Sequence, residues 1–286
     1  MRKLFYNIGK LVQTESGELL RRRSGAEMAD LNILEKAYML IDEEKIAGFG
    51  YMSDLTEDKV RDMMADESID VKGRMILPAF CDSHTHLVYA GSREIEFFDK
   101  LRGLSYSEIA ARGGGILNSA RLLHDTSEDD LLLQTISRAN EIISLGTGAV
   151  EIKSGYGLSL EDELKMLRVA RRIGEFTPLT VKTTFLGAHA VPERYTGRRS
   201  DYVDEIINEM IPVIASEELA DFIDVFTEEW FFTVEDTDRI LNAGMKYGLK
   251  PKVHANQMSY SGGVQVGVKY NAISVDHLEF TGEEEF

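Results

Sequence analysis

The chain has 286 residues, of which 43% are hydrophobic and 28% are charged, as is ordinary for a globular protein with a large core. Its formal net charge of −17 argues against a nucleic-acid partner, because phosphate binding needs a basic face, and gives no support for binding to an anionic membrane. No stretch is apolar for long enough to span a membrane, and a single cysteine, Cys81, excludes an intramolecular disulfide, so we expect a cytoplasmic protein.

Residues 1–75 are predicted to form a small β module. They contain short β-rich runs separated by turns of Gly, Asp and Glu, namely LFYNIGKLV, YMLIDEEKIAGFGY and SIDVKGRMILPAF. Pro78 marks the beginning of the main domain, which we expect to span residues 76–286.

From Met75 onward, predicted strands alternate with amphipathic helices. Several of the strands are near-continuous apolar runs, as expected for parallel strands covered on both faces. The six runs are MILPAFCDSH, GAVEIKS, LTVKTTFL, FIDVF, KPKVHAN and NAISVDH. The helices between them have clear boundary signals. They are predicted to run from Ser127 to Gly146, from Ser159 to Gly174 and from Thr233 to Gly248.

This alternation predicts an α/β fold with a TIM-type barrel, in addition to the small N-terminal β module. A doubly wound open sheet is the alternative, but no glycine fingerprint follows the first strand. A barrel of this type has eight strands and about 250 residues. Only six strand candidates are found, so we expect the barrel to be incomplete at its C-terminal end and the chain to be truncated.

Five of the six histidines lie in segments that end predicted strands. Because side chains alternate along a strand, His84 and His86 are expected to point the same way. The strand ends of a barrel converge, which would bring His254 and His277 to the same place. Imidazole nitrogens grouped in this way are typical metal ligands, and we predict that His84, His86 and His254 bind one metal ion.

Each histidine taken alone could instead be a hydrogen-bonded core residue, and His124, which lies outside these segments, is expected at the surface. The sequence offers no convincing carboxylate as a fourth ligand. Asp82 shares the face of His84 but lies deeper in the strand, and Asp276 is expected to face away from the site by alternation.

These residues resemble the amidohydrolase superfamily, in which a first strand ends in His-x-His, a fifth in His and a sixth in Asp-His. Within it, the chain is more similar to the imidazolonepropionases. The matching stretches are PAFCDSHTHLVYAGSRE, GGGI, VEIKSGYGL, TFLGAHAVP, GRRSDYVD, HANQ and DHLE. The resemblance implies hydrolysis of 4-imidazolone-5-propanoate to N-formimidoyl-L-glutamate in histidine degradation, by a metal-activated water.

By this resemblance, His84, His86 and His254 bind one divalent or trivalent ion, zinc or iron. The catalytic residue would be His277, which polarises the carbonyl or transfers a proton. The segment FIDVFTEEW has no lysine that could bridge two metals, which favours one ion.

The resemblance also implies a set of substrate-binding residues. Arg93 would hold the propionate carboxylate, which suits a planar guanidinium, although a surface ion pair remains an alternative. Tyr156 and His189 would bind the substrate, and Gln257 would hydrogen-bond the imidazolone ring. For Tyr156, simple packing in its turn remains open.

The family's fourth ligand and general base is an aspartate at the end of strand eight, for which this sequence has no counterpart. We therefore expect the chain to be inactive alone. Two other functions remain open: another amidohydrolase, such as a cytosine-deaminase-like or cyclic-amide hydrolase, and a non-catalytic metal-binding fragment. The expected partners are a small-molecule substrate and, by resemblance, a second copy in a homodimer.

Overall fold

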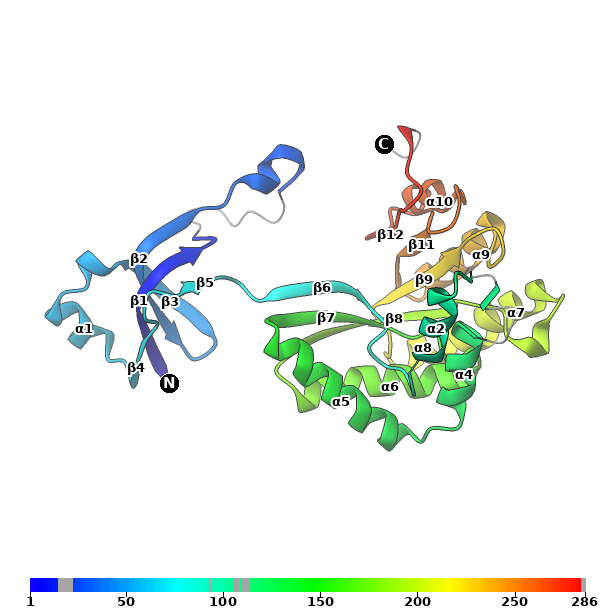
Figure 1. The fold of residues 1–286 in the computed structure, drawn as a ribbon, viewed down its shortest axis with the longest axis horizontal. Coiled ribbons are helices and arrows are strands. Elements are labelled where there is room, and N and C mark those ends of the chain that lie inside the picture. The colour runs from blue at the N-terminus through cyan, green and yellow to red at the C-terminus, as the bar shows by residue number, and fades with distance from the viewer. Residues whose placement is uncertain (15–22, 93, 105–107, 110–113, 284–286) are drawn as a thin grey trace. The chain divides into compact units, whose positions relative to one another are not determined.

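The computed structural model describes residues 1–14, 23–92, 94–104, 108–109 and 114–283. The chain folds as two units, Met1–Ala79 and Phe80–Phe286 (Figure 1). None of the described helices is long and apolar enough to cross a lipid bilayer.

The N-terminal unit is built on a five-stranded sheet in the order β3-β2-β1-β4, with β5 also paired to β1. Its strands are β1 (Arg2–Val12), β2 (Ile33–Asp42), β3 (Lys45–Tyr51), β4 (Glu67–Asp70) and β5 (Met75–Ile76). Strands β1 to β3 pair antiparallel, while β4 and β5 run parallel to β1. The short helices are η1 (Gly25–Ala29), η2 (Met52–Asp54) and α1 (Glu57–Met63).

Alternation along β2 explains how this small sheet has apolar side chains on both faces. Ala37 and Met39 pack with Ile8 in one cluster, whereas Tyr38 and Leu40 pack with Leu4 in another. The separate N-terminal β module predicted from the sequence is confirmed.

The second unit contains parallel strands in the order β12-β11-β9-β8-β7-β6, with β10 paired to β9. They are β6 (Phe80–Thr85), β7 (Thr147–Lys153), β8 (Thr180–Ala188), β9 (Phe222–Thr227), β10 (Lys250–Pro251), β11 (Val253–Ala255) and β12 (Val275–His277). The short β10 and β11 together occupy the single predicted run KPKVHAN, so the six predicted strand positions are all present. The predicted TIM-type barrel with about six of its strands is confirmed.

Helices join and cover these strands, and α5 and α6 lie along β7 and β8 (Figure 1). The helices are α2 (Glu94–Leu101), α4 (Ile116–His124), α5 (Glu128–Ser144), α6 (Leu160–Phe176), η3 (Glu193–Tyr195), α7 (Arg199–Glu205), η4 (Ile206–Met210), α8 (Ile211–Ser216), α9 (Val234–Lys246) and α10 (Gly263–Lys269).

The predicted helix starts coincide with observed caps. The hydroxyls of Ser127, Ser159 and Thr233 each accept a hydrogen bond from the backbone N–H three residues later. The predicted end of α6 at Gly174 is wrong by two residues, because this glycine keeps helical geometry and the helix continues to Phe176. These caps and the apolar faces behind them anchor the loops at the carboxyl ends of the strands, where the histidines lie.

Candidate metal centre

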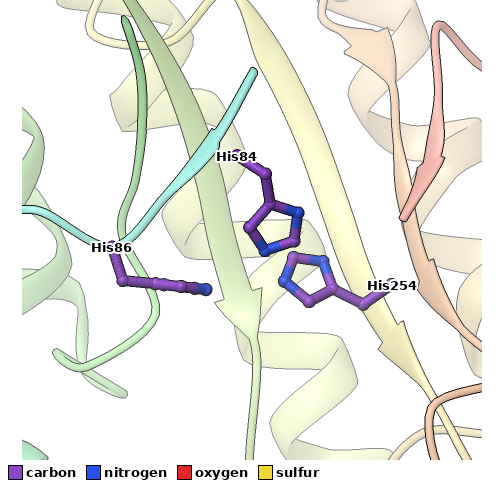
Figure 2. Close-up of side chains that lie close together, drawn as sticks. All are labelled: His84, His86 and His254. Carbon is purple, nitrogen blue, oxygen red and sulfur yellow. The ribbon is translucent and has the colours of Figure 1, made fainter. Parts of the chain in front are cut away.

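Three histidines converge at the carboxyl ends of β6 and β11. Each of His84, His86 and His254 offers a ring nitrogen, and these nitrogens all lie within 4.8 Å of one another. In Figure 2 the rings of His84 and His254 approach each other directly, while His86 reaches the group from one side. The ring centroids of His84 and His254 are 4.5 Å apart. The structure thus brings together the three residues that the sequence singled out as ligands.

Carboxylates orient two of the three rings. The Nδ1 of His84 lies 2.9 Å from the Oδ2 of Asp276, and the Nδ1 of His254 lies 2.9 Å from the Oδ2 of Asp224. A carboxylate on Nδ1 leaves Nε2 as the nitrogen that can bind a metal, which is the common arrangement at histidine-ligated metals.

The remaining nitrogens fit a metal ion. The Nδ1 of His86 and both ring nitrogens of His254 are buried, and none of the three makes a hydrogen bond among the described residues. The Nδ1 of His254 faces Asp224 as a close ion-pair contact, which leaves its Nε2 and the Nδ1 of His86 without any polar neighbour of this kind. Buried polar atoms almost always have a partner. A metal ion bound between the histidines would provide the partner that the Nε2 of His254 and the Nδ1 of His86 lack. Three imidazole nitrogens are also a donor set that suits zinc or iron.

The electrostatics favour the neutral form of His86 and His254, which is the form that binds metal. Burial, together with the neighbouring His189 and His254, lowers the pKa of His86 well below its ordinary value. Burial also lowers the pKa of His254, although the carboxylate of Asp224 opposes that shift.

His277 stands beside the same group, with its ring centroid 5.2 Å from that of His84 and 5.0 Å from that of His254. Its φ of +86° and the φ of +64° at Leu278 interrupt the extended backbone at the end of β12. The prediction that Asp276 faces away from the site is wrong, since its carboxylate contacts His84. Strict alternation fails here because the strand ends at the positive φ of His277, so both side chains reach the histidines.

Two further predicted residues gather around His86. The ring of His189 is stacked on that of His86, with centroids 4.9 Å apart and planes 7° from parallel. The ring of Tyr156 lies 5.3 Å from His86 and 5.4 Å from His189. A pocket of about 310 Å³ opens beside them, lined by His86, Tyr89, Ala90, Gly91, Ser92, Ser119 and Tyr156. Its size suits a small molecule.

A buried carboxylate holds the loop that carries Tyr156. Glu163, on the first turn of α6, accepts hydrogen bonds from the backbone N–H groups of Gly155, Gly157 and Leu158 at 2.8–3.1 Å. A Cβ on Gly157 would lie 2.4 Å from the backbone nitrogen of Glu163, so only glycine fits there. Burial raises the pKa of Glu163, and the hydrogen bonds of Ser154 and of the loop oppose that shift.

A second buried carboxylate holds the loop after β11. Glu228 accepts the backbone N–H groups of Gln257 at 2.6 Å and of Met258 at 3.2 Å, and the hydroxyl of Ser259 at 2.9 Å. The structure therefore fixes the backbone of Gln257 directly after the metal-centre strand. Arg93, the remaining predicted substrate residue, lies outside the described residues.

The sequence reasoning missed a set of buried charges next to the histidines. They are Glu151, Lys153, Asp224 and Lys252. The sequence did contain a signal for these buried ion pairs, namely the charged residues in the apolar runs VEIKS and KPKVH. A strand that is predicted to be buried rarely carries a lysine unless the lysine is paired. Their partners come from strands distant in sequence, as between Lys153 and Asp224, 71 positions apart.

Comparison with known proteins agrees with this architecture. No family model matches the chain. Its curated relatives include the imidazolonepropionase of Flavobacterium johnsoniae, 52% identical over 282 residues, which make up 99% of this chain and 67% of that protein. The imidazolonepropionase of Christiangramia forsetii is 50% identical over 285 residues, covering 100% of this chain and 68% of the relative. The chain thus spans about two thirds of the length of these relatives.

Solved structures show the same fold at low sequence identity. Guanine deaminase from E. coli aligns with a TM-score of 0.62 and 13% identity, covering 100% of this chain and 64% of that one. An uncharacterized metal-dependent hydrolase from Pyrococcus furiosus aligns with a TM-score of 0.61 and 12% identity, covering 100% and 74%. These likenesses show a shared fold, whereas the identity to the curated relatives is far higher and covers nearly the whole chain. The chain belongs to the imidazolonepropionase family.

Proposed function

We propose that this chain carries the metal-binding and substrate-binding part of an enzyme that hydrolyses 4-imidazolone-5-propanoate to N-formimidoyl-L-glutamate. The observation that carries the proposal is the convergence of His84, His86 and His254, with unpartnered buried nitrogens, in a chain 52% identical to an imidazolonepropionase. The neighbouring pocket of about 310 Å³, lined by Tyr156, supports a substrate of this size.

The three histidines would hold one zinc or iron ion. When bound, this ion supplies a Lewis acid that polarises the ring carbonyl and activates water. The two carboxylates behind His84 and His254 orient the rings so that their Nε2 atoms are presented to it.

His277 is proposed to stabilise negative charge that develops on the carbonyl oxygen, or to transfer a proton when the ring C–N bond breaks. Its ring lies next to those of His84 and His254, so it can reach a substrate held at the same place. Burial lowers the pKa of His277, which keeps the imidazole neutral and able to act at either nitrogen.

We propose that Tyr156 and His189 form the wall of the substrate pocket beside His86, which fits their mutual ring distances of about 5 Å. Arg93 is proposed to bind the propionate carboxylate through a bidentate contact. Gln257 is proposed to hydrogen-bond the imidazolone ring, and its fixed backbone after β11 supports that role.

Hydrolysis tests the proposal. The chain would be joined to the segment of the Flavobacterium johnsoniae relative that it does not match, loaded with zinc or iron, and assayed by the loss of the imidazolone absorbance. We expect turnover that falls about 10²–10⁴-fold in the His277→Asn variant, as for loss of an acid–base group. Hydrolysis of cytosine or a dihydropyrimidine in its place, or no hydrolysis by the metal-loaded protein, would contradict the proposal.

A further inference from the structure

The barrel interior next to the three histidines is lined by charge. Its buried group consists of Glu151, Lys153, Asp224, Lys252 and Asp276, whose side chains are at most 14% exposed. Barrel interiors are usually filled by branched apolar side chains, and buried ions cost free energy unless each is paired. Five charges at this place therefore indicate a role beyond packing.

Lys153 is the centre of the group. Its side chain is fully buried, and its Nζ lies 2.6 Å from Glu151 Oε1, 2.9 Å from Asp224 Oδ2 and 3.5 Å from Asp276 Oδ2. An ammonium has three N–H donors and no acceptor, and two of them donate to Glu151 and Asp224, while Asp276 lies beside the same charge as an ion-pair contact. One cation thus joins carboxylates from β7, β9 and β12.

The same carboxylate oxygens also contact the histidines. Asp224 Oδ2 lies 2.9 Å from the Nδ1 of His254, and Asp276 Oδ2 lies 2.9 Å from the Nδ1 of His84. Each oxygen therefore bridges Lys153 to one imidazole. An ionised carboxylate only accepts hydrogen bonds, so the Nδ1 of His84, which is hydrogen-bonded to Asp276, carries the proton. The Nδ1 of His254 lies 2.9 Å from Asp224 Oδ2 without a hydrogen bond, and a proton on this nitrogen avoids placing its lone pair against the carboxylate oxygen. In both rings the Nε2 then presents its lone pair.

Lys252 completes the connection between the strands. Its Nζ donates to the backbone oxygen of Ser83 at 3.0 Å and contacts Glu151. Ser83 directly precedes His84 on β6, and Lys252 lies two residues before His254. This side chain links the backbone beside one histidine to the strand of the other.

We propose that Lys153 is a positioning residue of the metal centre. By holding Asp224 and Asp276, it fixes both His84 and His254 as Nδ1–H tautomers, with their Nε2 atoms directed to one point. The inference rests on the proposed function only in identifying that point as a metal site, because the tautomers can be measured on the metal-free chain.

The test is ¹⁵N NMR of the histidine side chains in the metal-free protein, which distinguishes the two tautomers through the coupling of each nitrogen to the ring protons. The Lys153→Met variant removes the ammonium at similar length. The Asp276→Asn variant removes only the carboxylate of His84. Lys165→Met is the matched control, because Lys165 also pairs with a buried carboxylate, Asp162 at 2.8 Å, but on α6.

The expected result is a single Nδ1–H form at His84 and His254 in the unaltered chain and in Lys165→Met. In Lys153→Met both rings should gain an Nε2–H population, whereas in Asp276→Asn only His84 should. An Nε2–H form in the unaltered chain, or unchanged tautomers in a folded Lys153→Met variant, would overturn the proposal. If Lys153→Met fails to fold, Lys153→Gln, which also lacks the charge but keeps N–H donors, takes its place, and unchanged tautomers in that folded variant are equally contradictory.

Zinc affinity gives a second readout. Loss of the groups that orient metal ligands typically weakens binding about 10–100-fold, so we expect this loss in Lys153→Met and none in Lys165→Met. Zinc binding that is equal in the two variants would overturn the positioning role. A chain with the expected tautomers that binds no zinc would contradict the proposed function and leave this inference standing.

Discussion

The imidazole of His189 is stacked on that of His86, with 4.9 Å between centroids and 7° between planes. The Nδ1 of His189 is also 3.0 Å from the backbone oxygen of Gly155, which fixes the ring against the loop of Tyr156. His86, the proposed ligand whose ring contacts no carboxylate among the described residues, is thus supported by an aromatic neighbour. His189 can therefore support the site in two ways, through the stacking of its ring on His86 and through the contact of its nitrogen with the loop.

The ring of His189 should contribute to metal binding through His86. A stacked aromatic pair contributes about 1 kcal/mol, so His189→Ala is expected to weaken zinc binding about five-fold. His189→Phe keeps a ring in place and should retain most of the affinity. Competition of each variant against a zinc-binding dye measures the difference, and equal affinities of the two variants would show that stacking plays no part.

Glu163 should stabilise the loop of Tyr156. Glu163→Gln replaces one accepting oxygen by an N–H₂ group that faces backbone donors, so we expect a loss on the order of 2 kcal/mol in the free energy of unfolding. Glu161→Gln, in the same first turn of α6 but exposed, is the matched control and should change stability little. Urea unfolding gives the stabilities, and faster amide exchange at Gly157 and Leu158 should locate the effect.

The pair of His124 and Asp162 should make stability depend on pH. Asp162 accepts a hydrogen bond from His124, and this bond together with the carboxylate charge raises the pKa of His124 above its ordinary value. The protonated form is therefore favoured in the folded state. Its contribution is fully present below the unfolded pKa of about 6.5 and is lost as pH rises through the higher folded value.

His124→Gln should consequently lower stability relative to the unaltered chain at mildly acidic pH and match it at alkaline pH. Urea unfolding of both proteins over this range is the measurement. A stability difference that grows with rising pH would have the wrong sign for this pair.

The chain alone should bind metal without efficient hydrolysis. Among the described residues, the carboxylates that contact the rings of His84, His86 and His254 are Asp224 and Asp276, and both lie against Lys153 and an Nδ1. Neither is available as a general base, so turnover should be at least about 10²-fold below that of the joined form assayed above. Comparable rates for the two proteins would show that a base lies within this chain.

Local rules predicted much of the site. Alternation along β6 and the convergence of parallel strand ends were sufficient to place His84, His86 and His254 together. The same rule failed for Asp276, because the positive φ of His277 cannot be inferred from the residue type.

The buried ion pairs of Lys153 and Lys252 could not be predicted from the sequence for a different reason. Lys252 and Glu151 are 101 positions apart, and their contact depends on how the strands meet inside the barrel. A sequence shows that a lysine lies in an apolar strand, but its partner is set by tertiary structure. The strand order and curvature that bring these carboxylates to two lysines follow from packing along the whole barrel.

Metal stoichiometry tests the central claim most directly. The purified chain and its His254→Ala variant would be equilibrated with zinc in a metal buffer, and the bound ion measured by elemental analysis. We predict about one ion per chain, held by three protein nitrogens, and a loss of most of it in the variant. No bound zinc in the folded unaltered chain, or an equal amount in both proteins, would contradict the assignment of His84, His86 and His254 as the metal centre.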